Sequence, residues 1–495
     1  MKLFINHPFH FTVESIIRLF LPFVRLEHTD RPLSGEQIST CLTLTDVGAT
    51  LSAALLAGDG ERVHTERTPA ADLNLQADRD ECERLLAVCM YRVLSAQYGF
   101  APPWGVLTGI RPAKLFRQLA LDGGLTAARR QFAEKMLVSP EKIALVERAA
   151  EREKQIIAQS RPDSFSLYIG IPFCPTRCAY CSFISQSVAS AARLIPDYVG
   201  RLCEEVQTTA DIARRLGLRL MTVYIGGGTP TALPAPLLRQ VMDTVADCFN
   251  LSGVEYTVEA GRPDTVTKEQ LHIIRQGGAT RISINPQTLN DTVLQGIGRA
   301  HTAQQFFDAF ALARQCGMDN INTDLIAGLP GDTAAGFADT VDRLLALKPD
   351  SVTVHTLAIK RASDLGQNEK NSDKIGGGAY NREAALAAEQ RAYAQTALAA
   401  AGHAPYYLYR QSKTIGNLEN TGFSLPDRDC LYNVYIMDET HTILGCGASA
   451  VTKLRRPDGP EIERIFNFKH PFEYLSRFEE QQGRKERIES FYATL

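Results

Sequence analysis

The chain has almost no imbalance of charge. Its 53 Lys and Arg residues stand against 56 Asp and Glu residues, which gives a formal net charge of -3 over 495 residues and a pI near 6.4. Nucleic acids and anionic membranes attract proteins that carry a strong positive charge or a local basic face, and neither is evident here. We therefore expect neither a nucleic acid nor a membrane as a partner.

Long apolar runs are also missing. The most apolar stretch near the start, residues 16–24, is interrupted by Arg18 and lacks a basic flank followed by a small-residue cleavage site, so it predicts neither a signal peptide nor a membrane span. No internal repeat at solenoid spacing is visible. An apolar fraction of 44% and a charged fraction of 22% are ordinary for a globular protein. The expected location is the cytoplasm.

Cysteines are too scattered to form a disulfide framework. Of the 11 cysteines, only Cys174, Cys178 and Cys181 lie close together in the chain. The other eight are spread through apolar helical or strand-like surroundings, where buried reduced thiols are expected. The cysteines therefore predict that the protein works in a reducing compartment.

The C-x3-C-x2-C segment is the most informative part of the sequence. An apolar run at residues 165–171 leads into it, and Tyr180 and Phe183 supply aromatic cover. Three thiolates can bind three irons of a four-iron cubane and leave the fourth iron open to a small chelating molecule. A zinc knuckle or three unrelated core cysteines are alternatives, although zinc needs a fourth Cys or His at short spacing and none follows nearby.

Residues 1–160 predict an accessory α+β domain. Short β-like runs at 41–45 and 51–56 are followed by an amphipathic helix at 79–97 and a turn-rich connector at 102–114. A further helix opens at Ser139-Pro140, with Ser as N-cap and Pro at N1, and runs to about 159. The break at 161–164 places a domain boundary there.

Residues 161–360 predict an α/β domain. Six short β-branched strands alternate with helices, which indicates an all-parallel sheet curled as a partial (β/α)6 TIM-like barrel. The active site of such a barrel lies at the carboxyl ends of its strands. The predicted strands cover 165–171, 218–225, 254–259, 281–285, 320–326 and 351–356.

Residues 361–495 predict an α+β extension on the substrate side. A linker or lid at 365–381 precedes a long Ala-rich helix, and β-like runs follow at 406–410 and 432–437. A closing helix is expected near 472–488.

The strand ends carry glycines and polar residues that could contact a ligand. Three glycines let the backbone approach a ligand closely, although a triple glycine can also be a plain turn. An isolated acid such as Glu259 can equally form a structural salt bridge. The segments that follow the second to fifth strands are 224–231, 259–264, 283–288 with 297–301, and 322–331.

The order of these segments resembles the radical S-adenosylmethionine (SAM) superfamily. The Cys segment is similar to the family signature CxxxCxΦC, in which Φ is aromatic and is Tyr180 here. From 165 to about 450 the chain resembles the oxygen-independent coproporphyrinogen III oxidases. Residues 107–114 and 416–420 extend the similarity to the HemZ-type coproporphyrinogen dehydrogenases.

The resemblance implies two cofactors, a 4Fe-4S cluster and SAM. It implies that Cys174, Cys178 and Cys181 hold the cluster. The residues that it implies at SAM are Tyr180, Gly226, Gly227, Gly228, Thr229, Glu259, Gln287, Arg299 and Asp324. Among these, the glycines meet the methionine amino group, Glu259 supports the methionine, and Arg299 binds its carboxylate. Gln287 and Asp324 bind the ribose hydroxyls, which suits the hydrogen-bonding groups of their side chains.

The implied reaction is oxidative decarboxylation of coproporphyrinogen III to protoporphyrinogen IX in haem biosynthesis, with an electron donor such as flavodoxin or ferredoxin. A 5′-deoxyadenosyl radical would remove a hydrogen atom from a propionate side chain, and loss of carbon dioxide and of one electron to an acceptor would leave a vinyl group. The run 406–410, which ends in Arg410, offers phenols and a cation to the substrate carboxylates. Its alternative is an ordinary half-buried strand.

One departure keeps other functions open. The oxidases that the chain resembles carry another Cys two places after the third ligand, where this chain has Phe183. Phe at this position is a feature of the related haem chaperones. A haem-binding protein is therefore an alternative, with His355, His403 or His441 as its axial ligand. A radical enzyme acting on another tetrapyrrole is a third possibility.

Overall fold

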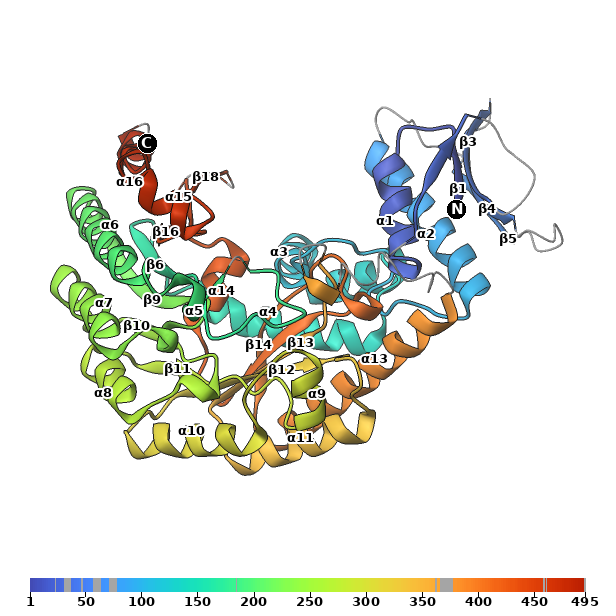
Figure 1. The fold of residues 1–495 in the computed structure, drawn as a ribbon. Helices are drawn as coiled ribbons and strands as arrows, with labels where there is room; N and C mark the ends of the chain where they lie inside the picture. The colour runs from blue at the N-terminus through green and yellow to red at the C-terminus, as the bar shows by residue number, and fades with distance from the viewer. Residues whose placement is uncertain are drawn as a thin grey trace.

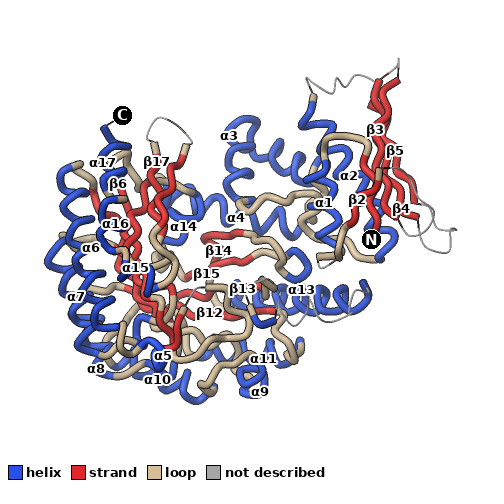
Figure 2. Tube along the Cα trace, turned by 45° about the horizontal axis from the view of Figure 1, so that its top comes forward, coloured by secondary structure: helices blue, strands red, loops and turns tan. Residues whose placement is uncertain are grey.

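The computed structural model describes residues 1–22, 24–30, 37–45, 48–56, 64–70, 78–183, 185–360, 363–365, 377–456, 459 and 461–493. Figures 1 and 2 show a large curved α/β body and a smaller N-terminal unit beside it.

The N-terminal unit is a five-stranded sheet with two helices, α1 (His10–Phe20) and α2 (Arg79–Tyr98), packed on it. Apolar residues of both helices and of the sheet share one core. The predicted strands near 41–45 and 51–56 and the predicted helix at 79–97 are confirmed. In sheet order the strands are β2 (Glu27–Thr29), β1 (Lys2–Ile5), β3 (Gln37–Thr45), β4 (Gly48–Leu56) and β5 (His64–Ala70).

Helices α3 (Pro112–Arg130) and α4 (Pro140–Ile157), separated by the π-helical turn η1 (Gln131–Lys135), connect this unit to the larger body. Ser139 caps α4 as expected, because its side chain accepts a hydrogen bond from the backbone N–H of Lys142 at 3.4 Å. The connector before α3 is fixed to the C-terminal part of the chain. The buried Trp104 donates from Nε1 to Glu419 at 2.7 Å. The predicted boundary at 160 stays a prediction.

Six parallel strands form the centre of the larger body. They lie side by side in chain order, as the sequence predicts, with β-branched and apolar residues buried against the outer helices. Crossover helices α6 (Ile195–Arg215), α7 (Ala235–Cys248), α8 (Lys268–Gln276), α10 (Ala303–Gln315) and α11 (Ala334–Ala346) cover the outside. The strands are β6 (Ser164–Ile171), β9 (Arg219–Gly227), β10 (Glu255–Glu259), β11 (Arg281–Ser283), β12 (Ile321–Ala327) and β13 (Ser351–Thr356).

The complete sheet has 11 strands and does not close. The fold is therefore a partial barrel, as predicted, and its six central strands are parallel as expected. The C-terminal extension adds further strands at both edges of this sheet. After β13 come β15 (Asn420–Ser424) and β14 (Ala404–Tyr409), both in antiparallel pairs. Beyond β6 come the parallel β16 (Thr442–Cys446) and then the antiparallel β17 (Val451–Arg455) and β18 (Ile462–Phe466). Short connections such as that from β16 to β17 permit only antiparallel neighbours.

The C-terminal extension differs from the sequence prediction in two places. Residues 432–437 lie in helix α14 (Leu431–Asp438) and not in a strand. The reason is a distant carboxylate, since Glu255 accepts hydrogen bonds from the N–H groups of Leu431 and Tyr432 at 2.8 and 3.0 Å and so caps the helix. The predicted closing helix is three short ones, α15 (Pro471–Ser476), α16 (Phe478–Gly483) and α17 (Glu486–Ala493).

The Ala-rich helix is confirmed as α13 (Gly377–Ala400). The predicted linker or lid at 365–381 falls largely on 366–376, which lie outside the described residues. Among the described helices, none combines the length and hydropathy that a membrane span requires. The remaining short elements are β7 (Phe173–Cys174), β8 (Gln186–Ser187), α5 (Val188–Ala191), η2 (Pro230–Ala232), η3 (Pro263–Thr265), α9 (Asp291–Gly296) and η4 (Ile415–Asn417).

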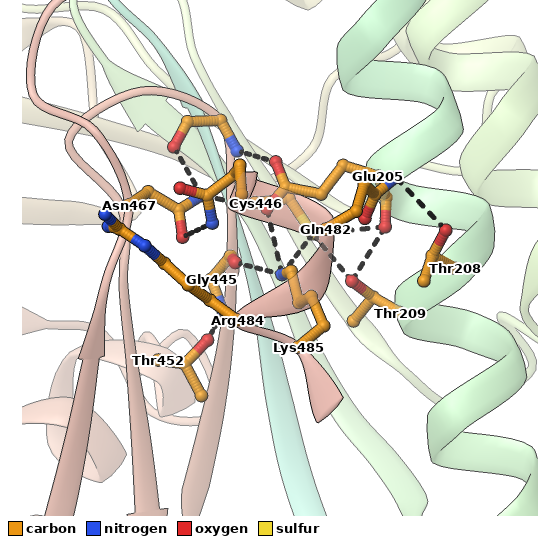
Figure 3. A network of polar contacts seen from close by, with 12 residues as sticks. Glu205, Thr208, Thr209, Gly445, Cys446, Thr452, Asn467, Gln482, Arg484 and Lys485 are labelled. Carbon is orange, nitrogen blue, oxygen red and sulfur yellow. Dashed lines mark hydrogen bonds and ion pairs between the residues drawn. The ribbon is translucent and has the colours of Figure 1, made fainter. Parts of the chain in front are cut away.

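A buried polar network joins the last helices to the barrel (Figure 3). Lys485 forms an ion pair with Glu205 of α6 at 3.0 Å, and both side chains are almost fully buried. Glu205 also accepts from Asn467, Tyr474 and the N–H of Gly447 at 2.6–2.8 Å. Because the buried charges are paired and hydrogen-bonded, the network fixes the C-terminal helices against α6.

Candidate active site

The cysteine segment lies at the carboxyl end of β6, on the wall of a cavity of about 300 Å³. Cys174, Cys178 and Cys181 are all free thiols and all line this cavity. Active sites of α/β barrels lie at this end of the strands. The structure therefore places the three predicted cluster ligands where chemistry is expected.

The loop at 297–299 holds the cysteine segment from the side. The N–H of Ala179 donates to the carbonyl of Ile297 at 3.0 Å, and the hydroxyl of Thr176 donates to the carbonyl of Gly298 at 3.3 Å. Gly298 has φ of +74°, a conformation that favours glycine. The positions of the cysteines thus depend on a backbone more than 100 residues downstream.

The three glycines at the carboxyl end of β9, Gly226 to Gly228, allow the strand to approach the cysteine segment. A Cβ atom at position 228 would lie 2.6 Å from the carbonyl oxygen of Phe173, so only glycine fits. Gly227 and Gly228 line the cavity, whereas Gly226 does not. A Cβ at Gly226 would instead lie 2.9 Å from the carboxylate of Glu259. Thr229 follows, with its hydroxyl 3.6 Å from the sulfur of Cys174.

Glu259 lies at the end of β10 and faces the cavity. It forms no salt bridge with the residues that the structure describes, but accepts a hydrogen bond from the phenol of Tyr224 at 2.5 Å. Burial raises the pKa of Glu259 to about 7, although the hydrogen bond from Tyr224 lowers it. The carboxyl group can therefore change its charge near neutral pH.

Arg299 and Gln287 bring polar atoms without partners to the cavity wall. Arg299 donates from Nη1 to the carbonyls of Asn285 at 2.7 Å and Gly261 at 3.2 Å, and from Nη2 to the phenol of Tyr180 at 3.3 Å. Its Nε and the Oε1 of Gln287 are buried and have no hydrogen-bond partner among the described residues. Buried polar groups are normally paired, so these atoms are suited to a polar ligand.

Asp324, in the middle of β12, completes the site. Its carboxylate accepts from Asn322 at 2.8 Å and lies 3.7 Å from Nε2 of His355. Burial would raise the pKa of Asp324, but the contact with His355 and the hydrogen bonds outweigh it and lower the pKa. The phenol of Tyr409 lies 3.4 Å from Nδ1 of the same histidine. An ionised carboxylate thus faces the cavity.

The structure brings all the predicted site residues except Gly226 to one cavity. Arg262 and Asn285 belong to segments that the sequence singled out, but no role was predicted for them. His355 was considered only as a haem ligand. Its place at the end of the sixth strand is the signal that could have identified it. Further lining residues without a prediction include Lys360 and Gln411.

The predicted docking role of Arg410 is wrong. Its side chain is only 4% exposed and does not line the cavity. The guanidinium donates to the carbonyls of Leu107, Gly109 and Asn417 and lies over the ring of Trp104. It joins the connector to the segment after β14. Tyr409, its neighbour, does line the cavity.

Of the three histidines considered as haem ligands, His355 alone lines the cavity. His403 is buried and its Nε2 lies 2.9 Å from the carbonyl of Pro349. His441 is buried between the hydroxyls of Ser160 and Ser166, each at 2.8 Å. Both of these histidines have structural partners.

The donor set fits a cubane cluster. Within the described part of the chain, no three His, Cys, Asp or Glu side chains are arranged to hold a single metal ion. A cubane makes a different demand, because each thiolate binds its own iron. Three free thiols on one cavity wall, beside unpaired polar atoms for a chelating molecule, meet that demand.

Comparison with known proteins identifies the family. Residues 168–344 match the radical SAM superfamily. The chain is 35% identical to the oxygen-independent coproporphyrinogen-III oxidase-like protein HemZ of Bacillus subtilis (strain 168), over 96% of this chain and 94% of the relative. The chain belongs to the radical SAM superfamily. Radical SAM proteins use a 4Fe-4S cluster and SAM, so the two expected cofactors are confirmed.

Two further proteins that are similar to this radical SAM chain have names that describe different functions. The haem chaperone HemW of Bacillus subtilis is 36% identical over 39% of this chain and 51% of the relative. Among solved structures, coproporphyrinogen III oxidase (HemN) of Escherichia coli matches with a TM-score of 0.51 and 23% identity, over 67% of this chain and 73% of that one. The second match confirms the fold of a radical SAM partial barrel.

Proposed function

We propose that this chain is an oxygen-independent coproporphyrinogen III oxidase, which converts coproporphyrinogen III to protoporphyrinogen IX in haem biosynthesis. The observation that carries the proposal is the near full-length similarity to the coproporphyrinogen-III oxidase-like HemZ, which includes the N-terminal unit and the C-terminal extension. The reaction would take place in the reducing cytoplasm. Flavodoxin or ferredoxin would supply the electron.

The three cysteines would hold the cluster, one iron each, and leave the fourth iron for the cofactor. When bound, the cluster and SAM supply the one-electron chemistry that removes a hydrogen atom from the substrate. The hydrogen bonds of Thr176 and Ala179 with the 297–299 loop would keep the cysteine segment fixed during the reaction. Fixed positions matter because a small displacement of reacting atoms slows a reaction greatly.

The predicted residues would bind SAM by its charged and polar groups. Glu259 and the backbone at 226–228 would accept hydrogen bonds from the methionine ammonium group. Thr229 would support this part of the cavity wall, beside Cys174. Arg299 would bind the methionine carboxylate, with its unpaired Nε supporting this role. Gln287 and Asp324 would accept hydrogen bonds from the ribose hydroxyls. Tyr180 would hold Arg299 in place.

The same cavity would take the tetrapyrrole. Lys360, Tyr409 and Gln411 line it together with His355. Lys360 is half-buried and donates to the carbonyl of Ser412 at 2.9 Å. An ammonium group there would attract a propionate, in place of the contact first expected from Arg410.

A second candidate function, haem carriage, has its own support. Phe183 occupies the position where the oxidases have Cys, and its ring is 67% exposed beside the cavity. Haem chaperones are among the relatives. In that case His355 would serve as the axial ligand, since it lines the cavity. A radical reaction on another tetrapyrrole would use the same cavity.

Anaerobic turnover distinguishes these functions. Reconstituted protein is incubated with reductant, SAM and coproporphyrinogen III, and the porphyrinogen products are identified by mass. We expect two successive losses of carbon dioxide, each with one 5′-deoxyadenosine formed. Stoichiometric haem binding that H355A abolishes, with no decarboxylation, would instead support the carrier. Cleavage of SAM that only another tetrapyrrole stimulates would support the third function.

A further inference from the structure

Arg262 is a buried cation that the predicted SAM contacts do not use. It follows β10, is 3% exposed, and lines the cavity. Asp264 binds the guanidinium through both oxygens, with Nε at 3.1 Å and Nη2 at 3.2 Å. Such a two-point contact fixes the plane of the guanidinium. It leaves Nη1 free to donate in one direction.

That direction is the cysteine segment. Nη1 of Arg262 donates to the hydroxyl and the carbonyl of Thr176 at 3.1 and 3.4 Å. The same nitrogen lies 3.9 Å from the sulfur of Cys178. Arg299 is the other buried arginine of the site, and its terminal nitrogens donate hydrogen bonds to Gly261, Asn285 and Tyr180. Arg299 also interacts with the thiol of Cys178, so both arginines lie near this sulfur, whereas Arg262 in addition contacts Thr176 and Asp264.

We propose that Arg262 is a positioning residue for the cluster, which donates a hydrogen bond to the sulfur of Cys178 and raises the reduction potential of the cluster. Hydrogen bonds to the sulfurs and nearby charge are among the factors that set the potentials of iron–sulfur clusters. A cation stabilises the reduced state more than the oxidised one, because the reduced cluster carries one more negative charge. Burial strengthens this effect.

Lysine cannot replace Arg262 in this role. One ammonium group cannot bind both oxygens of Asp264 and also reach Thr176 and Cys178, whereas the planar guanidinium does all three. A simple structural ion pair between Arg262 and Asp264 would affect folding stability and leave the cluster potential unchanged. The potential therefore separates the two roles.

The inference rests on the proposed role of the three cysteines and not on the identity of the substrate. The test compares the wild type with R262Q, R262K and the control R239Q, which alters an exposed arginine of α7. Each protein is reconstituted anaerobically and its iron content is measured. The midpoint potential is then determined by redox titration followed by electron paramagnetic resonance, without substrate.

We expect R262Q to keep its iron and to have a more negative potential. At a fixed applied potential, the ratio of reduced to oxidised cluster should fall about tenfold, equivalent to about 59 mV for one electron. R262K should shift in the same direction, and R239Q should match the wild type. If R262Q does not retain iron, the midpoint potential of R262K is compared with that of the wild type, and a more negative value supports the inference.

An unchanged midpoint potential in R262Q or R262K, with the iron retained, would overturn the inference. Loss of iron in both variants would also overturn it, because Arg262 would then be a purely structural residue. A wild-type protein that holds no cluster at all would instead contradict the proposed function. The two failures are therefore distinguishable.

Discussion

The phenol of Tyr224 donates a hydrogen bond to Glu259 at 2.5 Å, in the interior of the barrel. The ring of Tyr224 is stacked on Tyr432 of α14, with 4.4 Å between ring centroids. A residue of the C-terminal extension thus packs directly behind a predicted SAM contact. The extension helps to set the environment of Glu259 as well as to lengthen the sheet.

The first prediction concerns the pH dependence of SAM binding. Burial raises the pKa of Glu259 to about 7, and only the ionised carboxylate can attract the ammonium group. The dissociation constant should therefore increase about tenfold for each pH unit below 7, because binding must release a proton. Calorimetry of the anaerobic protein between pH 5.5 and 8 measures this.

Two variants control the assignment. E259Q should bind SAM more weakly at pH 8 and should lose the pH dependence. Y224F removes a hydrogen bond that lowers the pKa of Glu259, so its transition should move to higher pH. A wild-type dissociation constant that is flat across this range would contradict the role of Glu259.

The second prediction concerns the cluster ligands. C178A should lose most of its iron after anaerobic reconstitution, because two thiolates cannot hold a cubane securely. C316A is a matched control, since Cys316 and Cys178 are both 8% exposed, and it should keep its iron. Iron and sulfide analysis with the visible absorption spectrum measures the outcome. Full iron content in C178A would show that this thiol is not a ligand.

The third prediction concerns Asp324. D324N keeps the shape of the side chain but removes its charge, and a hydrogen bond to a charged group contributes about 1.5–3 kcal/mol. The dissociation constant for SAM should increase by about 10- to 150-fold, while the iron content stays at the wild-type level. D339N changes an exposed aspartate on α11 and should have no effect. Equal affinity in D324N and the wild type would remove Asp324 from the site.

The fourth prediction concerns Arg410. Since its guanidinium donates to carbonyls of the connector and of the segment after β14, R410M should leave buried carbonyls unpaired. The loss in stability should be about 2–4 kcal/mol, visible as a lower midpoint of thermal unfolding. SAM affinity should not change. R239M tests for a general effect of losing an arginine. A wild-type unfolding midpoint in R410M would contradict the structural role.

Much of the fold could be predicted because its signals are local. The six central strands are short runs rich in apolar residues, and five of them end in, or directly before, a glycine or polar residue. The capped start of α4 is a short-range pattern at Ser139-Pro140. The cysteine spacing predicts an iron–sulfur cluster, and the resemblance to radical SAM proteins implies SAM. Because parallel strands end at one edge of a sheet, residues such as Glu259 and Asp324 could be expected in one site.

What could not be predicted depends on contacts between distant segments. Residues 431–438 form a helix because Glu255 caps it, and nothing near 431 signals this. Arg410 resembled a docking residue because sequence does not show burial. The sequence indicates no role for Arg262 for the same reason, since its contact with Thr176 spans 86 residues of chain.

Transfer of hydrogen from substrate to cofactor tests the central claim most directly. The reconstituted protein is incubated anaerobically with reductant, SAM and coproporphyrinogen III that carries deuterium on its propionate side chains. We predict that the 5′-deoxyadenosine formed contains deuterium and that its amount matches the carbon dioxide released. Unlabelled 5′-deoxyadenosine, with the porphyrinogen recovered unchanged, would contradict the proposal that this chain decarboxylates coproporphyrinogen III.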